Sequence, residues 1–204
     1  MKIIVYGAGI LLENCLASIR RVWSGQVDVV HGVAPYAEFG TSEFNAATRI
    51  KLRALIEAAE GAEDFLYLDD DTVLLADPSA SVSSMLDQAL LWFQADGDTA
   101  CMGCVLVRPA PMARALFKST LEYTWFGDCN DQDAVNAHLW IPILNANVRK
   151  LPNTWASSGK ASFLDDPPVR GRYVVHANYY RGVAAKVDIL KRNGYWFLRM
   201  EAAV

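Results

Sequence analysis

The chain has 204 residues, of which 52% are hydrophobic and 21% charged, so we expect one well-filled core and a single domain. The formal net charge of −4 excludes a general attraction to nucleic acid, while a local basic groove stays open. No apolar run approaches the roughly 18 residues of a membrane span. Residues 1–6 resemble a first strand more than a signal peptide, because Gly7-Ala8-Gly9 ends the run. We therefore expect no transmembrane segment and a cytoplasmic location.

Apolar spacing predicts alternating strands and helices in the first half of the chain. The expected elements are a strand at 2–6, a helix at 11–22, a strand at 27–30, a turn at 35–44, a helix at 46–59 and a buried strand from 65 that ends in three acids. Gly7-Ala8-Gly9 invites a dinucleotide-binding interpretation, but Leu12 stands where the third glycine of that motif would fall. A tight turn at Gly7 that lets a base or ribose approach the backbone stays open.

The second half continues this alternation. The expected elements are a helix at 82–90, a short apolar segment at 91–94, a strand at 100–108, helices at 112–123 and 131–139, an extended segment at 141–144 and a strand at 173–176. Strands separated by helices of this length predict an α/β fold, in which a mostly parallel twisted sheet is flanked by helices on both faces.

Asp69-Asp70-Asp71 is the most informative motif, because three carboxylates stand between two apolar runs. A buried strand that ends in acids delivers them to the carboxyl edge of the sheet, where α/β proteins bind ligands. Carboxylates this close repel one another unless a cation neutralises them, and oxygen ligands suit Mg²⁺ or Mn²⁺. The alternative is a solvated turn.

The four cysteines, at 15, 101, 104 and 129, predict buried thiols in a reducing compartment. Cys101 and Cys104 form a single C-x-x-C pair, which cannot supply four zinc ligands, so we expect both to pack in the core.

Three later segments add polar groups to the acids. Gly103 interrupts a strand, which suits a close approach to a ligand. Residues 131–136, Asp-Gln-Asp-Ala-Val-Asn, cluster polar groups at a helix start, which taken alone favours N-capping by Asp131. From His176 to Lys186 the chain passes an amide, an arginine and a glycine, a set suited to a metal-bound diphosphate.

These segments, in this order, resemble nucleotide-diphospho-sugar transferases, the glycosyltransferases of the GT-A fold. The likeness rests on the D-x-D motif at 69–71, the strand at 102–108, the D-Q-D-x-x-N motif at 131–136 and the H-x5-G-x3-K motif at 176–186. Arg49-Ile50-Lys51-Leu52 is placed like the basic helix that precedes D-x-D in such enzymes. The resemblance implies one GT-A-like domain over 1–204, with a nucleotide-binding half at 1–95. A donor-sugar and acceptor half at 96–204 would end in the metal and diphosphate segment.

The resemblance also implies roles for the metal and the donor, a UDP- or GDP-sugar. Asp69, Asp71 and His176 would bind Mn²⁺ or Mg²⁺, with Asp69 also able to contact the ribose and Asp70 acting as a spacer. Asp131 and Gln132 would face the donor sugar and its anomeric carbon. The other expected donor contacts are Gly7, Lys51, Gly103, which would leave room for the sugar, Asn178, Gly182 and Lys186, which would neutralise the diphosphate.

The chemistry agrees with this assignment, because breaking the bond between sugar and diphosphate builds negative charge on the phosphate and positive charge on the sugar. Relatives with the H-x5-G-x3-K segment usually retain the sugar configuration, so we expect retention. Cys101 stands where such families often have Asn. Trp125, Phe126, Trp155 and Tyr180 are candidate aromatic platforms, with burial in the core as the default expectation. The acceptor stays open among saccharide, lipid, protein, small molecule and modified nucleic acid.

Two alternatives remain. Asp69-Asp70-Asp71-Thr72-Val73-Leu74 also fits the motif of haloacid-dehalogenase-like phosphatases, with Asp69 as nucleophile, Asp71 as acid/base and Asp165-Asp166 as metal ligands. Two predicted strands precede the motif here, whereas it normally opens the first strand. The second alternative is a non-catalytic nucleotide-sugar-binding module.

Overall fold

The computed structural model describes residues 1–32, 41–139, 146–158 and 172–198. Most of the expected turn at 35–44, the extended segment at 141–144 and the acids Asp165 and Asp166 lie outside the described residues.

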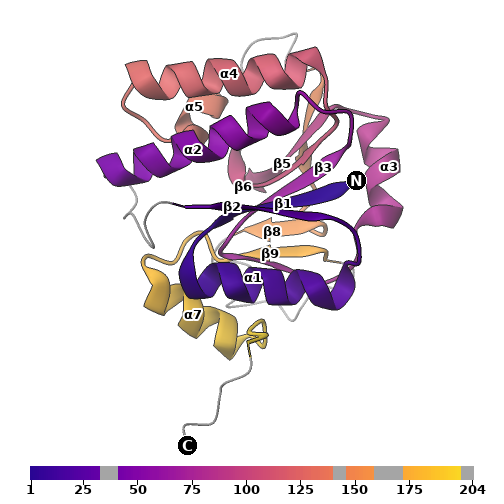
Figure 1. Cartoon of the computed structure of the whole chain (residues 1–204), viewed down its shortest axis with the longest axis vertical. Helices are drawn as coiled ribbons and strands as arrows, with labels where there is room; N and C mark the ends of the chain where they lie inside the picture. Colours follow the sequence, from indigo (N-terminus) through magenta and orange to yellow (C-terminus); the bar gives the residue numbers. More distant parts are fainter. Residues whose placement is uncertain (33–40, 140–145, 159–171, 199–204) are drawn as a thin grey trace, which may run out of the picture.

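A six-stranded sheet forms the centre of the molecule (Figure 1). Its order is β2 (Val27–His31), β1 (Lys2–Gly7), β3 (Phe65–Asp69), β6 (Thr99–Val107), β5 (Leu91–Asp96) and β7 (Val148–Leu151). β1 is parallel to β2 and β3, β5 is parallel to β7, and β6 is antiparallel to both β3 and β5. Every strand except β6 therefore points the same way, which confirms the mostly parallel sheet.

Alternation along the strands creates two apolar faces, each covered by helices. On one face, Leu66 and Leu68 of β3 pack in a cluster with α1 (Gly9–Val22) and α3 (Ser79–Leu86). On the other, Phe65 and Tyr67 pack against α2 (Ser42–Ala58), α4 (Pro111–Phe126) and α5 (Asp131–His138). Figure 1 shows α2 and α4 on one side of the sheet and α1 on the other.

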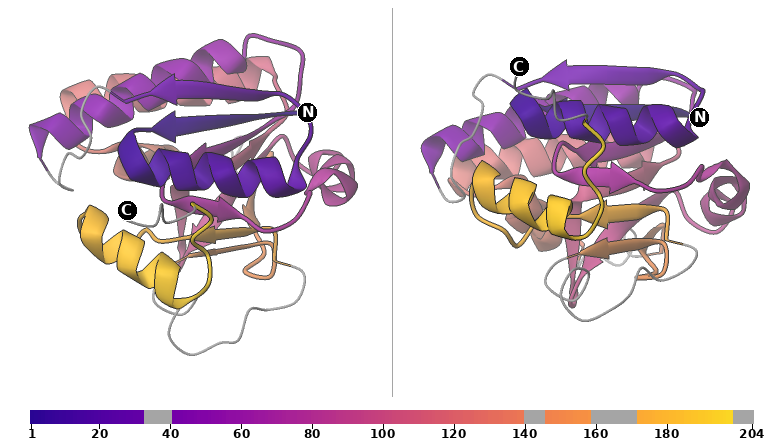
Figure 2. Two further views of the ribbon diagram at one scale, coloured as in Figure 1. Left: turned by 60° about the horizontal axis from the view of Figure 1, so that its bottom comes forward. Right: turned by 90° about the horizontal axis from the view of Figure 1, so that it is seen from below.

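A second, three-stranded sheet lies on the α1 side and was not predicted (Figure 2). It consists of β4 (Thr72–Leu74), β9 (Val174–His176) and β8 (Ala156–Ser158), with β9 in the middle. A third apolar cluster joins it to α7 (Val183–Arg192) and to Leu11 of α1. Because β4 is only three residues long and pairs with a distant strand, local patterning could not reveal it.

Several helix ends differ from prediction. α2 begins four residues earlier than expected, because the Thr41 hydroxyl accepts a hydrogen bond from the Phe44 amide at 3.2 Å. α3 ends at Leu86 instead of residue 90. β7 and β8 were missed because both are short. No helix in the described ranges is long and apolar enough to cross a bilayer.

Candidate active site

The three acids lie where β3 ends and the chain turns into β4. Thr72 begins β4, and its hydroxyl donates to the carbonyl oxygen of Asp69 at 2.7 Å. β4 pairs with β9 so that Thr72 lies opposite His176, and the Ala177 amide donates to the carbonyl oxygen of Asp71 at 3.0 Å. This strand pairing brings His176 to the acids from a distant part of the sequence.

Asp69, Asp71 and His176 form a group that could hold a metal ion. One ligand atom from each of the three residues lies within 4.8 Å of the other two, and Asp71 and His176 are buried. Two carboxylate oxygens and one imidazole nitrogen make a donor set that suits Mn²⁺, whereas Mg²⁺ prefers oxygen alone. The residues therefore fit a divalent cation.

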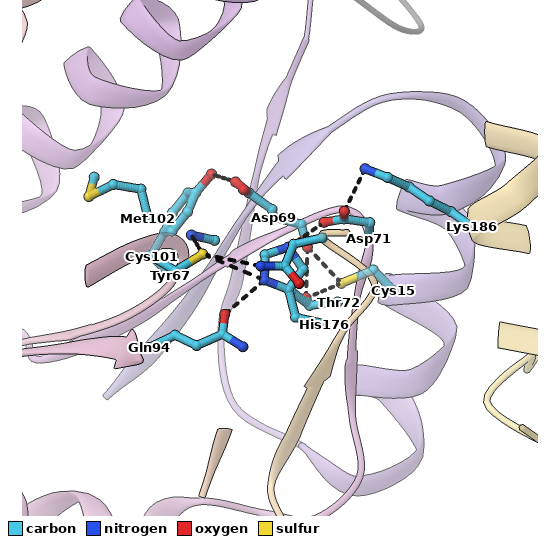
Figure 3. Close-up of polar contacts among 12 residues, drawn as sticks. Cys15, Tyr67, Asp69, Asp71, Thr72, Gln94, Cys101, Met102, His176 and Lys186 are labelled. Carbon is cyan, nitrogen blue, oxygen red and sulfur yellow. Dashed lines mark hydrogen bonds and ion pairs between the residues drawn. The ribbon is translucent and has the colours of Figure 1, made fainter. Parts of the chain in front are cut away.

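Asp71 is the most strongly compensated acid of this group. His176 Nε2 lies 2.9 Å from Asp71 Oδ1, and Lys186 Nζ lies 2.6 Å from Asp71 Oδ2 (Figure 3). Burial alone would raise the pKa of Asp71, but these two cations hold the pKa well below its usual value. In return, the Asp71 carboxylate raises the pKa of His176 to about 10, although burial opposes this shift. Asp71 is therefore ionised at neutral pH.

Lys51 joins Asp69 to Asp131. Its ammonium lies 3.1 Å from Asp69 Oδ1 and 2.6 Å from Asp131 Oδ2, and it is buried. Burial would lower the pKa of Lys51, but Asp131 and Asp69 raise it above its usual value. The Tyr67 hydroxyl, which the sequence did not single out, also donates to Asp69 Oδ1. Lys51 and Tyr67 thus fix the orientation of the Asp69 carboxylate.

Asp70 points away from this group, toward the turn after β1. Its Oδ2 accepts a hydrogen bond from the Ala8 amide at 3.0 Å. Burial, followed by the charge of Asp71, raises the pKa of Asp70 to about 7. A Cβ at Gly7 would lie only 2.1 Å from the Cβ of Asp70. The Asp70 side chain therefore fills the space on the Cβ side of Gly7, and the expected approach of a base or ribose to the Gly7 backbone stays a prediction.

Gly103 makes room for the side chain of His176. A Cβ at this position would lie 2.0 Å from His176 Cε1, so the missing side chain admits the imidazole ring, and the expected room for a donor sugar stays a prediction. While Nε2 of His176 contacts Asp71, the second ring nitrogen, Nδ1, lies 2.7 Å from Gln94 Oε1 and 3.9 Å from Cys101 Sγ. Gln94 was missed, although a polar residue within the apolar segment 91–94 was a usable signal.

The D-Q-D-x-x-N motif forms the first turns of α5. Asn130, and not Asp131, is the N-cap, because its Oδ1 accepts from the Asp133 amide at 2.9 Å. This frees the Asp131 carboxylate to pair with Lys51. Gln132 Nε2 donates to Asp96 Oδ2 at 3.0 Å. Asn136 bonds both the amide and the carbonyl of Ala100 at 2.8 Å, which fastens α5 to β6.

Both ends of the segment from His176 to Lys186 contact Asp71. Gly182 is the N-cap of α7 with φ of 74°, a backbone conformation that favours glycine, and nothing lies within 4 Å of where its Cβ would be. Lys186 lies in the first turns of α7 and reaches Asp71. Asn178 Nδ2 lies 3.9 Å from Cys101 Sγ. His176, Asn178 and Lys186 thus lie near the acids.

The aromatic candidates include both buried and exposed side chains. Trp155 is buried as expected, whereas Trp125 is 58% and Phe126 91% exposed, so the default of burial is wrong for these two. The Arg49 guanidinium stacks 4.0 Å from the centre of the Trp125 ring.

All four cysteines are free thiols, and Cys104 packs in the core as predicted.

The fold is similar to that of solved glycosyltransferases. The galactosyltransferase LgtC, solved with donor and acceptor sugar analogues, matches with a TM-score of 0.57 and 15% identity over 98% of each chain. A glycosyltransferase involved in glycosylation of the PBCV-1 major capsid matches with a TM-score of 0.61 and 14% identity, over 95% of this chain and 98% of that one. The chain therefore has the fold of GT-A glycosyltransferases.

The glycosyltransferase GlyE of Streptococcus pneumoniae TIGR4 matches with a TM-score of 0.55 and 15% identity, over 86% of this chain. This chain spans only 54% of the length of GlyE. No curated protein sequence matches. The family model of nucleotide-diphospho-sugar transferases matches residues 20–190, and the chain belongs to this family.

The contact between Gly103 and His176 can be tested by a double-mutant cycle. Gly103→Ala should destabilise the protein by about 1–3 kcal/mol, because the added methyl group collides with the imidazole. In a His176→Ala background, where the ring is absent, the same substitution should cost far less. Urea denaturation measures all four stabilities. Equal costs in both backgrounds would contradict the assigned contact.

Proposed function

We propose that this chain is a metal-dependent glycosyltransferase that moves a sugar from a UDP- or GDP-sugar to an acceptor, with retention of configuration. The observation that carries the proposal is the meeting of Asp69, Asp71 and His176, with Lys186 bonded to Asp71. A cation site of this kind next to a lysine suits a nucleotide diphosphate, whose negative charge both can neutralise. Membership of the nucleotide-diphospho-sugar transferase family supports the same substrate class.

On the leaving-group side, Asp69, Asp71 and His176 would hold the cation, with Mn²⁺ preferred over Mg²⁺. When bound, the cation stabilises negative charge on the departing diphosphate. Lys186 would donate to the diphosphate, and the open backbone at Gly182 would let a phosphate approach the start of α7. Asn178 would contribute a further amide contact.

On the sugar side, Asp131 and Gln132 would face the donor and its anomeric carbon. Both side chains are held in place, Asp131 by Lys51 and Gln132 by Asp96. Such fixed oxygens suit a transition state in which the sugar becomes positively charged. Lys51 would act on the donor by orienting Asp69 and Asp131. The Gln132 amide and the Asp131 carboxylate lie on consecutive residues, so the structure supports either as the group nearest the anomeric carbon.

The proposed organisation is one domain with two functional halves. Residues 1–95 would bind the nucleotide, and residues 96–204 would bind the sugar and the acceptor and supply the metal and diphosphate segment. We propose that the protein acts in the cytoplasm. Saccharide, lipid, protein, small-molecule and modified nucleic-acid acceptors are all to be screened.

The family match does not favour the haloacid-dehalogenase-like phosphatase. In addition, Asp69 already bonds Lys51 and Tyr67, and the motif follows the third strand of the chain. A non-catalytic module would share the fold and the donor site but would show no turnover.

A panel of nucleotide sugars separates these functions. With Mn²⁺, at least one UDP- or GDP-sugar should raise the melting temperature, because ligand binding stabilises the native state. Slow release of free nucleotide diphosphate should follow, and the anomer of the released or transferred sugar, read by NMR, reports retention. Cleavage of p-nitrophenyl phosphate with no response to any nucleotide sugar would favour the phosphatase. Donor binding without turnover across broad acceptor libraries would favour the module.

The two neighbouring acids Asp70 and Asp71 provide a matched pair of variants. Asp71→Ala should abolish Mn²⁺-dependent donor binding, because it removes a ligand and the partner of His176 and Lys186. Asp70→Asn should keep donor binding, because the Asp70 side chain accepts a hydrogen bond from the Ala8 amide and is not one of the three proposed metal ligands, Asp69, Asp71 and His176. Isothermal titration with and without Mn²⁺ measures both. Unchanged donor affinity in Asp71→Ala would refute the metal assignment.

A further inference from the structure

His176 is held on its far side by a buried glutamine. Gln94 is 0% exposed, and its Oε1 lies 2.7 Å from His176 Nδ1, while Nε2 on the opposite side of the ring lies 2.9 Å from Asp71 Oδ1. An amide oxygen can only accept a hydrogen bond, so this contact is a hydrogen bond when Nδ1 carries a proton. Figure 3 shows Gln94 and Asp71 on opposite sides of the imidazole ring.

A change of register in the sheet aims Gln94 at this ring. In the pairing of β5 with β6, Phe93 lies opposite Val105, but the next residue, Gln94, lies opposite Cys101. Three residues of β6, including Gly103, therefore have no opposite residue on β5. Irregularities of this kind redirect side chains next to functional sites. Here Gln94, Cys101 and Gly103 together surround the imidazole.

Burial of Gln94 is unfavourable for the stability of the fold, because part of its amide group makes no hydrogen bond with the described residues. Its Nε2 has no hydrogen-bond partner in the described part of the chain, although it is fully buried. A buried amide that leaves its NH₂ group unsatisfied destabilises the fold compared with an apolar residue of similar size. The hydrogen bond to His176 is the interaction that Gln94 makes in return.

We propose that Gln94 is a positioning residue that keeps one proton of His176 on Nδ1, so that Nε2, once it gives up its own hydrogen and its contact with Asp71, turns its lone pair to the metal position beside Asp69 and Asp71. This inference rests on the proposed metal-dependent function. A metal-bound histidine commonly donates its other ring N–H to a fixed acceptor, which sets both its tautomer and its orientation. Gln94 would supply that acceptor without touching the metal or the donor.

Titration of Mn²⁺ alone, followed by electron paramagnetic resonance of the free ion, tests this role. Gln94→Leu should weaken Mn²⁺ binding about 10–100-fold. Gln94→Glu keeps an acceptor oxygen opposite Nδ1 and should keep most of the affinity. Phe93→Leu is the packing control: this buried neighbour faces the opposite apolar cluster, so stability should fall and Mn²⁺ affinity should not. Should Gln94→Leu not fold, Gln94→Asn, whose amide is one methylene too short, should show the same loss.

Nitrogen-15 NMR gives a second readout, which is tractable because the chain has only three histidines. With Zn²⁺ as a diamagnetic probe, wild-type His176 should be protonated at Nδ1 and metal-bound at Nε2, and Gln94→Leu should lose this signature. Unchanged Mn²⁺ affinity in folded Gln94→Leu, or weaker binding with an unchanged tautomer, would overturn the positioning role alone. A wild-type protein that binds no Mn²⁺ would overturn the metal site, and this role with it.

Discussion

The buried negative charge of Asp71 is the constraint on which the rest of the structure depends. Removing a carboxylate from water is strongly unfavourable unless opposite charges and hydrogen bonds compensate for it. His176 and Lys186 provide that compensation, and both come from the last part of the chain. The second sheet, with α7 packed on it, therefore holds together the same groups that would bind a cation and a diphosphate. Stability and function depend here on one set of contacts.

Two glycines also shape the site, because the absence of their side chains leaves room for side chains from other segments. Gly7 admits Asp70, which draws the middle acid away from its two neighbours, and Gly103 admits the ring of His176. Lys51 and Tyr67 fix Asp69 from the other side of the sheet. Asp69, Asp71 and His176 thus each have their own supports, which come from α2, β3, β5, β6 and α7.

The sequence predicted what local patterns control. The central sheet, its helices and the acids at its edge follow from apolar periodicity and from the abrupt end of a buried strand. The meeting of Asp71 with His176 came only from the resemblance to a family, because no local signal reveals that β4 pairs with β9. The contacts of Gly7 with Asp70 and of Gly103 with His176 were not predicted for a similar reason, since the side chains that fill the space beside these glycines come from other segments. Gln94 was missed because its direction depends on a register change in the sheet.

The central claim is that Asp69, Asp71 and His176 hold one divalent cation at the carboxyl edge of the sheet. Diffraction at the manganese absorption edge, from crystals soaked with Mn²⁺ and UDP, tests it most directly. The account predicts an anomalous peak bonded to one oxygen of each aspartate and to Nε2 of His176, with the UDP diphosphate on its open side next to Lys186. A peak at another place, or UDP bound with no manganese at these three residues, would contradict it.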